Sequence, residues 1–245
     1  MSTFKDYLAE FKKLENKSWQ VKLDHILTYY RLPLLITLTL LVILISQITH
    51  FATMKETVLS GRCINAVYDA SVSQQFLDKL SDELNIDKNR SKLTLSHSLL
   101  SSKDIQSSII THQLITAEIA ANSLDFLVGE TQTLLQYAYD ESFADLRAIL
   151  PPDPAKILSP SFLYIDAALA NSFHDSADQA HQFPDPTTPE AMTQPVPVAV
   201  QIPKGSPFNQ VYYSQTHNTI AITIIANAPN PATAAQFIAL TCLPD

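Results

Sequence analysis

Residues 32–54 form an uncharged, apolar stretch between Arg31 and Lys55, and its core reads LPLLITLTLLVILISQI. As a helix, these twenty-three residues would span about 34 Å at about 1.5 Å per residue. That length is enough to cross a hydrocarbon core of about 30 Å. The sequence therefore predicts a transmembrane helix at Leu32–Met54, which separates a short N-terminal segment from residues 55–245.

A cleaved signal is a poor alternative for this stretch. About thirty residues precede it, its apolar core is too long for a signal peptide, and no A-x-A pattern follows it. Cys63 could suggest a lipoprotein, but the preceding residue is Arg62, where a small residue is needed. An intracellular buried helix of this length would be out of place in a small domain. An uncleaved signal anchor is the favoured interpretation.

The flanking charges predict the orientation of the chain. The N-terminal segment holds six basic residues: Lys5, Lys12, Lys13, Lys17, Lys22 and Arg31. Because basic residues are retained in the cytoplasm, we expect residues 1–31 inside, and 55–245 as an extracellular domain of a single-pass cell-membrane protein. Residues 55–245 hold ten of the sixteen basic and twenty of the twenty-four acidic residues, a net charge of −10. Such a domain is a poor partner for nucleic acid or an anionic lipid surface.

The cytoplasmic segment 1–31 is predicted to be an amphipathic juxtamembrane helix. Apolar residues such as Phe4, Leu8 and Phe11 recur at helical spacing. Trp19 and Tyr30 precede the apolar stretch, where aromatic rings favour the headgroup region. An interfacial helix along the inner leaflet is the simpler interpretation. Docking to another membrane protein is the alternative.

Alternating strand and helix patterns predict one α/β domain for residues 55–245. Strands are expected at 57–67, 92–100 and 124–129, and helices at 71–86, 103–122 and from about 130 to before Pro151. Ser71 and Gln74 have the spacing of a capping box. Strands that alternate with helices indicate an open, mostly parallel sheet with flanking helices.

The second half of the domain is less regular. Strands are expected at 161–169, 196–202 and 218–226, and a closing helix at 231–243, which Pro231 can open. Residues 171–195 contain four prolines and are predicted to be an extended loop.

Two segments resemble bacterial extracellular solute-binding proteins of ABC importers. The first is LDFLVGETQTLLQYAYDESFADLRAILPPD, and the second is IAITIIANAPNPATAAQFIALTCL. A short leader and one span before such a domain also resemble membrane proteins of low-GC Gram-positive bacteria. The resemblance implies one lobe of a solute-binding fold and a non-enzymatic binding role. The partner would be a membrane or cell-surface protein, or a small-molecule ligand.

The chain departs from that family in two ways. Solute-binding proteins have two similar lobes, whereas residues 55–245 leave little room for a second lobe. They are also secreted or lipid-anchored, whereas this chain is predicted to carry its own helix. We therefore expect a reduced relative with a binding or interaction role. The alternative is a membrane-tethered substrate-binding component of an ABC importer. A surface hydrolase is a third class, but no nucleophile–base pair is evident.

The predicted ligand site lies at the carboxyl ends of the parallel strands. With only three glycines, the chain has no P-loop, dinucleotide fingerprint or nucleophile elbow. Open α/β sheets bind ligands beyond the carboxyl ends of their strands, where helix N-termini offer free N–H groups. This rule selects Tyr68, Asp69 and Ser71, together with Gly129, Glu130 and Thr131. The competing interpretation is that Ser71 and Thr131 only cap helices.

Metal and disulfide chemistry receive less support. His174, Asp175, Asp178 and His181 lie close together in a loop that lacks the spacing of a metal motif, so a solvated loop is favoured and no metal or cofactor is predicted. Cys63 and Cys242 both fall on the outer, oxidising side, where a disulfide could close a long loop. Two buried free thiols are the commoner outcome, and both possibilities stay open.

Overall fold

The computed structural model describes residues 18–20, 24, 28, 31–67, 70–100, 105–140, 142–173, 183–214 and 219–243. The chain divides into two compact units, Met1–Met54 and Lys55–Asp245. Most of the predicted juxtamembrane helix lies outside the described residues. The same is true of Tyr68, Asp69 and the four residues considered for metal binding, namely His174, Asp175, Asp178 and His181.

The first unit contains helix α3, Arg31–Thr53, which coincides with the predicted apolar helix. Its large apolar side chains are between 45% exposed at Leu34 and 74% exposed at Leu32. Within the described part of the chain, no helix has the combined length and hydropathy required for crossing a membrane. The structure therefore contains the predicted helix but gives the predicted transmembrane role no support.

The second unit is built on a six-stranded mixed sheet with the order β3-β1-β4-β8-β6-β5. Its strands are β1 (Glu56–Ile64), β3 (Ser91–Ser98), β4 (Phe126–Glu130), β5 (Phe162–Asp166), β6 (Pro195–Gln201) and β8 (Ile220–Ile224). β1 pairs parallel with β3 and β4, whereas β8 is antiparallel to β4 and β6, and β5 is antiparallel to β6. Four of the six strands thus share one direction, with β8 and β5 opposed to them.

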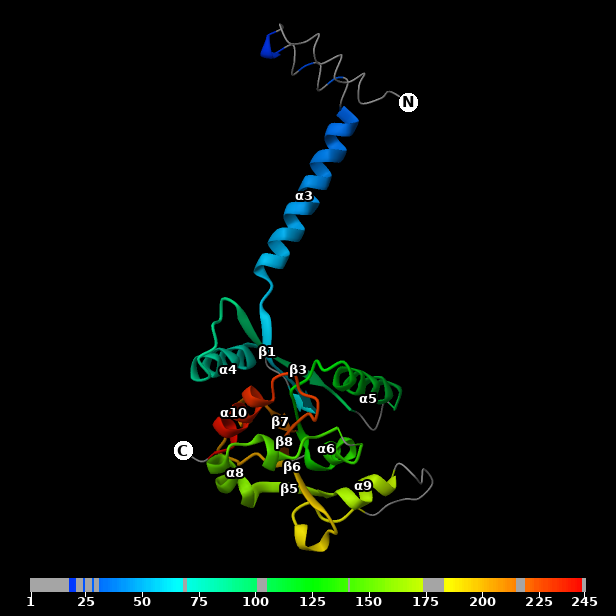
Figure 1. Ribbon diagram of the computed structural model, residues 1–245, viewed down its shortest axis with the longest axis vertical. Coiled ribbons are helices and arrows are strands. Elements are labelled where there is room, and N and C mark those ends of the chain that lie inside the picture. Colours follow the sequence, from blue (N-terminus) through cyan, green and yellow to red (C-terminus); the bar gives the residue numbers. More distant parts are fainter. Residues whose placement is uncertain are drawn as a thin grey trace. The chain divides into compact units, whose positions relative to one another are not determined.

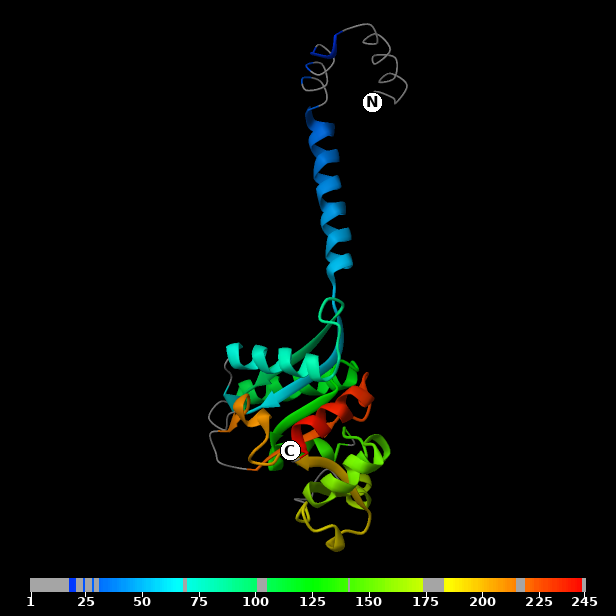
Figure 2. The ribbon, with the colours of Figure 1, turned by 90° about the vertical axis from the view of Figure 1, so that its left-hand side faces the viewer.

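Helices cover both faces of the sheet, so the predicted α/β architecture is confirmed. Figure 1 shows the sheet with α4, α8 and α10 on one side and α5, α6 and α9 on the other. Their bounds are α4 (Ala70–Glu83), α5 (Ile105–Ala120), α6 (Thr131–Ala138), α7 (Leu146–Ile149), α8 (Pro152–Leu158), α9 (Ala167–Phe173) and α10 (Pro231–Cys242). Figure 2 shows α4 and α10 lying across one face. Two layers of helices therefore enclose the sheet.

Each face of the sheet has its own hydrophobic core. The core beneath α4 and α10 contains Phe126 from β4 and Phe237 from α10, whose ring centroids are 4.5 Å apart. The core beneath α5 and α6 contains Ile64, Ile115 and Leu134. Because alternate residues of a strand point to opposite faces, Gly61 and Cys63 of β1 face the first core, and Arg62 and Ile64 face the second.

Three asparagines occupy positions where glycine is the more usual residue. Asn65, Asn85 and Asn122 have φ angles of 61°, 53° and 52°. Asn85 and Asn122 follow the ends of α4 and α5, where the left-handed conformation closes a helix. Asparagine tolerates this conformation better than other non-glycine residues. A chain with only three glycines thus forms these turns with asparagine.

The sequence-based boundaries needed four corrections. The strand predicted at 57–67 breaks at Asn65, so that β2 (Ala66–Val67) leaves the main sheet and pairs with β7 (Tyr213–Ser214). The third helix ends at Ala138 rather than continuing to Pro151, because Phe143 forms a β-bridge with Ile225. The strand predicted at 161–169 ends at Asp166, where α9 begins. The predicted loop 171–195 accordingly starts within α9.

Candidate functional site

The residues predicted to bind a ligand lie in three settings. Gly129 and Glu130 end β4 and are buried, while Ser71 is an exposed residue in the first turn of α4. Thr131 is the first residue of α6, and both its N–H and its Oγ1 donate to the carbonyl oxygen of Thr219, at 3.1 and 3.2 Å. Glu130, not Thr131, is the N-cap of α6. The hydroxyl of Thr131 therefore ties the start of α6 to Thr219 and does not cap the helix.

A distant segment covers the carboxyl end of β1. The hydroxyl of Tyr212 is buried and donates to the carbonyl oxygen of Ile64 at 2.6 Å. Burial raises the pKa of Tyr212, and the nearby Glu130 carboxylate adds to this effect, so the phenol stays protonated. The side-chain oxygen of Asn65 accepts from the N–H of Leu100 at 2.7 Å, which ties β1 to the end of β3. The ends of both strands are thus engaged in contacts within the protein.

A small pocket lies at the opposite ends of the strands. It is formed where β1 and β3 begin beneath α4, and its lining includes Lys55, Lys92, Asp78 and Leu77. Its volume is about 100 Å³, whereas pockets for drug-sized ligands have about 300–1,000 Å³. It is therefore not a cavity for a solute of that size.

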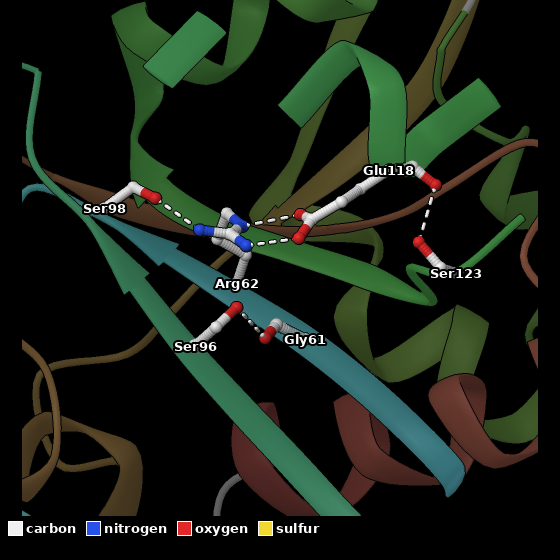
Figure 3. Close-up of polar contacts among 6 residues, drawn as sticks. All are labelled: Gly61, Arg62, Ser96, Ser98, Glu118 and Ser123. Carbon is white, nitrogen blue, oxygen red and sulfur yellow. Dashed lines mark hydrogen bonds and ion pairs between the residues drawn. The ribbon is translucent and has the colours of Figure 1, made fainter. Parts of the chain in front are cut away.

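A buried polar cluster around Arg62 was not found from the sequence. Arg62 of β1 is 6% exposed and points toward α5. Its Nε and Nη2 donate to the two carboxylate oxygens of Glu118, at 2.8 and 2.5 Å, and its Nη1 donates to Oγ of Ser98 at 2.5 Å (Figure 3). The backbone carbonyl of Glu118 accepts from the N–H and the hydroxyl of Ser123, at 3.1 and 3.0 Å. This cluster joins β1, β3 and the end of α5.

The arrangement suits a structural role rather than ligand binding. In a bidentate pair the carboxylate balances the charge of the guanidinium and accepts two of its hydrogen bonds. The sequence did contain a signal, because Arg62 is the lone charged residue of the strand 57–67 and Glu118 is the lone Asp, Glu, Lys or Arg of 105–120. A buried charge needs an opposite charge beside it, so these two residues could have been paired.

A tyrosine–histidine contact lies close to the Arg62 cluster. The hydroxyl of Tyr137 in α6 is 2.5 Å from Nδ1 of His112 in α5. Burial raises the pKa of Tyr137 well above its usual value, against the opposing effect of the Arg62 charge. Tyr137 is therefore a protonated phenol that links α5 to α6 and not a candidate base.

Both cysteines are buried free thiols. Burial raises the pKa of the Cys63 thiol far above its usual value and that of Cys242 to about 11. Because the thiolate is the reactive form, neither side chain is poised as a nucleophile. Across the described ranges, no group of three or more His, Cys, Asp or Glu side chains could hold a metal ion.

Two buried carboxylates hold loops to the sheet. Asp125 is fully buried, and its oxygens accept from the N–H groups of Ser60 at 2.7 Å and Asn230 at 2.6 Å. Asp166 is 4% exposed and accepts from the N–H groups of Thr193, Gln194 and Ala168, at 2.8, 2.9 and 3.1 Å. Each carboxylate joins segments that are distant in the sequence, and local sequence patterns do not reveal these contacts.

The contacts of Asp166 predict that the stability of the domain depends on pH in the acidic range. Burial alone would raise the pKa of Asp166, but its backbone donors together hold the pKa below its usual value. A carboxylate with a depressed folded-state pKa contributes stability above its unfolded pKa, about 3.9, and loses that contribution as the pH falls through the folded value. We expect Asp166→Asn to lower the free energy of unfolding at pH 7. Denaturant titrations should show this deficit shrinking as the pH falls from about 4. A deficit that is equal at pH 7 and below pH 3 would contradict this origin.

Comparison with known proteins adds little to this geometry. No protein family matches the chain, and no curated protein matches its sequence. A solved structure with some likeness is the ABC substrate-binding protein Lmo0181 from Listeria monocytogenes in complex with cycloalternan, at 12% identity and a TM-score of 0.26. The match covers 52% of this chain and 35% of that one, so this chain spans about a third of its length. At this TM-score the match carries no argument about the fold or the function of this chain.

Proposed function

We propose that this chain is a non-enzymatic interaction protein in which α3 anchors the α/β domain to a membrane. One observation carries the proposal: α3 has 23 residues, and its sole Asp, Glu, Lys or Arg is Arg31 at its first position. Its large apolar side chains are about half to three-quarters exposed. Exposed apolar surface of this extent marks contact with lipid or protein.

Two further features of α3 support an apolar surrounding. Its 23 residues correspond to about 34 Å of helix, slightly more than a hydrocarbon core of about 30 Å. The hydroxyls of Thr39 and Thr49 donate to the carbonyl oxygens of Leu35 and Ile45, one turn earlier, at 2.8 and 3.0 Å. Such bonds satisfy hydroxyl groups where no water is available. The carbonate experiment below decides whether α3 holds the chain in a membrane.

The interaction role is inferred from what the polar groups inside the domain do. Arg62 is bound by Glu118 and Ser98, while Asp125 and Asp166 hold backbone N–H groups. These groups join elements of the fold to one another. We therefore assign the function to the surface of the domain, with a membrane or cell-surface protein as partner and with residues 55–245 outside the cell.

The alternative from the sequence is a membrane-tethered component that binds substrate for an ABC importer. It requires a solute cavity and a small-molecule ligand. The covered end of β1 and the pocket of about 100 Å³ beneath α4 give this alternative no additional support.

Extraction of membranes with alkaline carbonate tests the anchor. We expect the full chain to stay with the membrane pellet. Replacing Leu41 and Leu44 with arginine should release it, because an arginine at the centre of a spanning helix costs about 2.5–3.5 kcal/mol on insertion scales. Ile157→Arg with Leu240→Arg is the matched control, since these side chains are 55% and 42% exposed in the domain. Release of the unchanged chain by carbonate would refute the anchor.

A further inference from the structure

Helix α5 exposes an apolar row on the surface of the domain. Ile110 is 58% and Leu114 is 46% exposed, and Ala117 and Ala121 are exposed in the same row. Leu99, which is 66% exposed, adjoins this row because its carbonyl oxygen accepts from the hydroxyl of Thr111 at 3.4 Å. The opposite face of α5 carries Ile115, which is fully buried in the core. The α5 row, defined as Ile110, Leu114, Ala117 and Ala121, is thus additional to the face that holds α5 on the sheet.

The spacing and sizes in the α5 row fit a second copy of itself. Successive residues are four, three and four positions apart, which is the spacing of a two-helix seam. The first two side chains are large and the last two are small. An antiparallel, two-fold pairing would place Ile110 opposite Ala121 of the second copy, and Leu114 opposite Ala117. Large residues then meet small ones at every step, as close helix packing requires.

The α5 row itself adds no like-charge repulsion to the pairing of two copies. Residues 55–245 carry a net charge of −10, so two copies repel each other over most of their surfaces. Within residues 105–121, Glu118 is the sole Asp, Glu, Lys or Arg, and it is held by Arg62. The α5 row therefore lets two acidic domains approach without bringing like charges together.

We propose that the α5 row is the interface of a two-fold, antiparallel dimer of this chain. The interface residues of one copy are the interface residues of the other, as two-fold symmetry requires. A single helix pair buries little surface, so the pairing is weak in dilute solution. Confinement by α3 would raise the effective concentration and strengthen it. This strengthening rests on the proposed anchor, whereas the pairing itself does not.

Cysteine cross-linking tests the pairing geometry in the full chain, purified in detergent. Chains carrying Leu114→Cys are mixed with chains carrying Ala117→Cys and mildly oxidised. Cys63 and Cys242 are buried, so we expect neither of them to form cross-links between chains. We expect the mixture to form covalent dimers at least about tenfold faster than Ile157→Cys chains alone, since tenfold corresponds to about 1.4 kcal/mol of preference. Ile157 is the matched control, because it is 55% exposed on α8.

The cross-linking outcomes separate the alternatives. Faster linking of Leu114→Cys to itself than to Ala117→Cys would indicate a parallel seam and overturn the proposal. Linking no faster than that of Ile157→Cys would mean that something other than a second copy covers the row, which also overturns it. Leu114→Asp should weaken dimerisation at least about tenfold in analytical ultracentrifugation, while Ile157→Asp leaves it unchanged. Because these readouts use detergent, failure of the anchor in the carbonate experiment would leave the dimer result standing.

Discussion

Gly61→Ala should lower the free energy of unfolding by about 3 kcal/mol, at the upper end of the cost of overpacking a core. A Cβ atom at residue 61 would lie 2.0 Å from Cζ of Phe126, well inside the contact distance of two carbon atoms. The ring cannot simply move aside, because it packs against Phe237 with centroids 4.5 Å apart. Denaturant unfolding followed by circular dichroism measures the change.

The chain offers a matched control and a rescue for this substitution. A Cβ atom at Gly205 meets no atom within 4 Å, so Gly205→Ala should change stability by less than about 0.5 kcal/mol. Combining Gly61→Ala with Phe126→Leu makes room for the methyl group and should cost less than the sum of the two single changes. Equal costs for Gly61→Ala and Gly205→Ala would show that β1 and β4 do not approach as described.

Glu118→Gln should destabilise the domain by about 3 kcal/mol, because breaking a buried ion pair leaves an uncompensated charge. Arg62 is only 6% exposed, and glutamine keeps the shape of the side chain but not its charge. Replacing both members, Arg62→Met with Glu118→Met, removes the buried charge and should recover most of the loss. Thermal and denaturant unfolding of these two variants and the unchanged chain measure the loss and its recovery.

The same chemical change on the surface provides the control. Glu83 pairs with Lys79 one turn away, and both side chains are exposed. Glu83→Gln should therefore cost at most about 0.5 kcal/mol, as exposed pairs on a helix do. A cost of Glu118→Gln no larger than that of Glu83→Gln would mean that Arg62 has access to water, and that the cluster does not hold α5 to the sheet.

Local sequence patterns sufficed for much of the fold. The periodicity of 92–100 predicted β3, that of 103–122 predicted α5, and Pro231 marked the start of α10. These elements are long enough for their buried faces to repeat. β2 and β7 contain two residues each, so their pairing leaves no periodic signal. The early end of α6 was missed because Phe143 has helical spacing but contacts Ile225, which is distant in sequence.

The candidate site was harder to predict than the fold for a similar reason. The rule that ligands bind at carboxyl ends of strands assumes that these ends are open. Tyr212 contacts Ile64 from 148 residues away, and this distant contact covers the end of β1. The Arg62–Glu118 pair was predictable in principle, since each is an isolated charge in an otherwise uncharged element. Pairing isolated charges across elements would have found it.

Protease accessibility in intact cells that express the full chain tests the central proposal most directly. We expect added protease to remove residues 55–245, while an N-terminal tag ahead of residue 1 survives with the membrane pellet until the cells are opened. Recovery of the intact chain in the soluble fraction would contradict the anchor. Protection of 55–245 in sealed cells, with digestion only after lysis, would contradict the placement of the domain outside the cell.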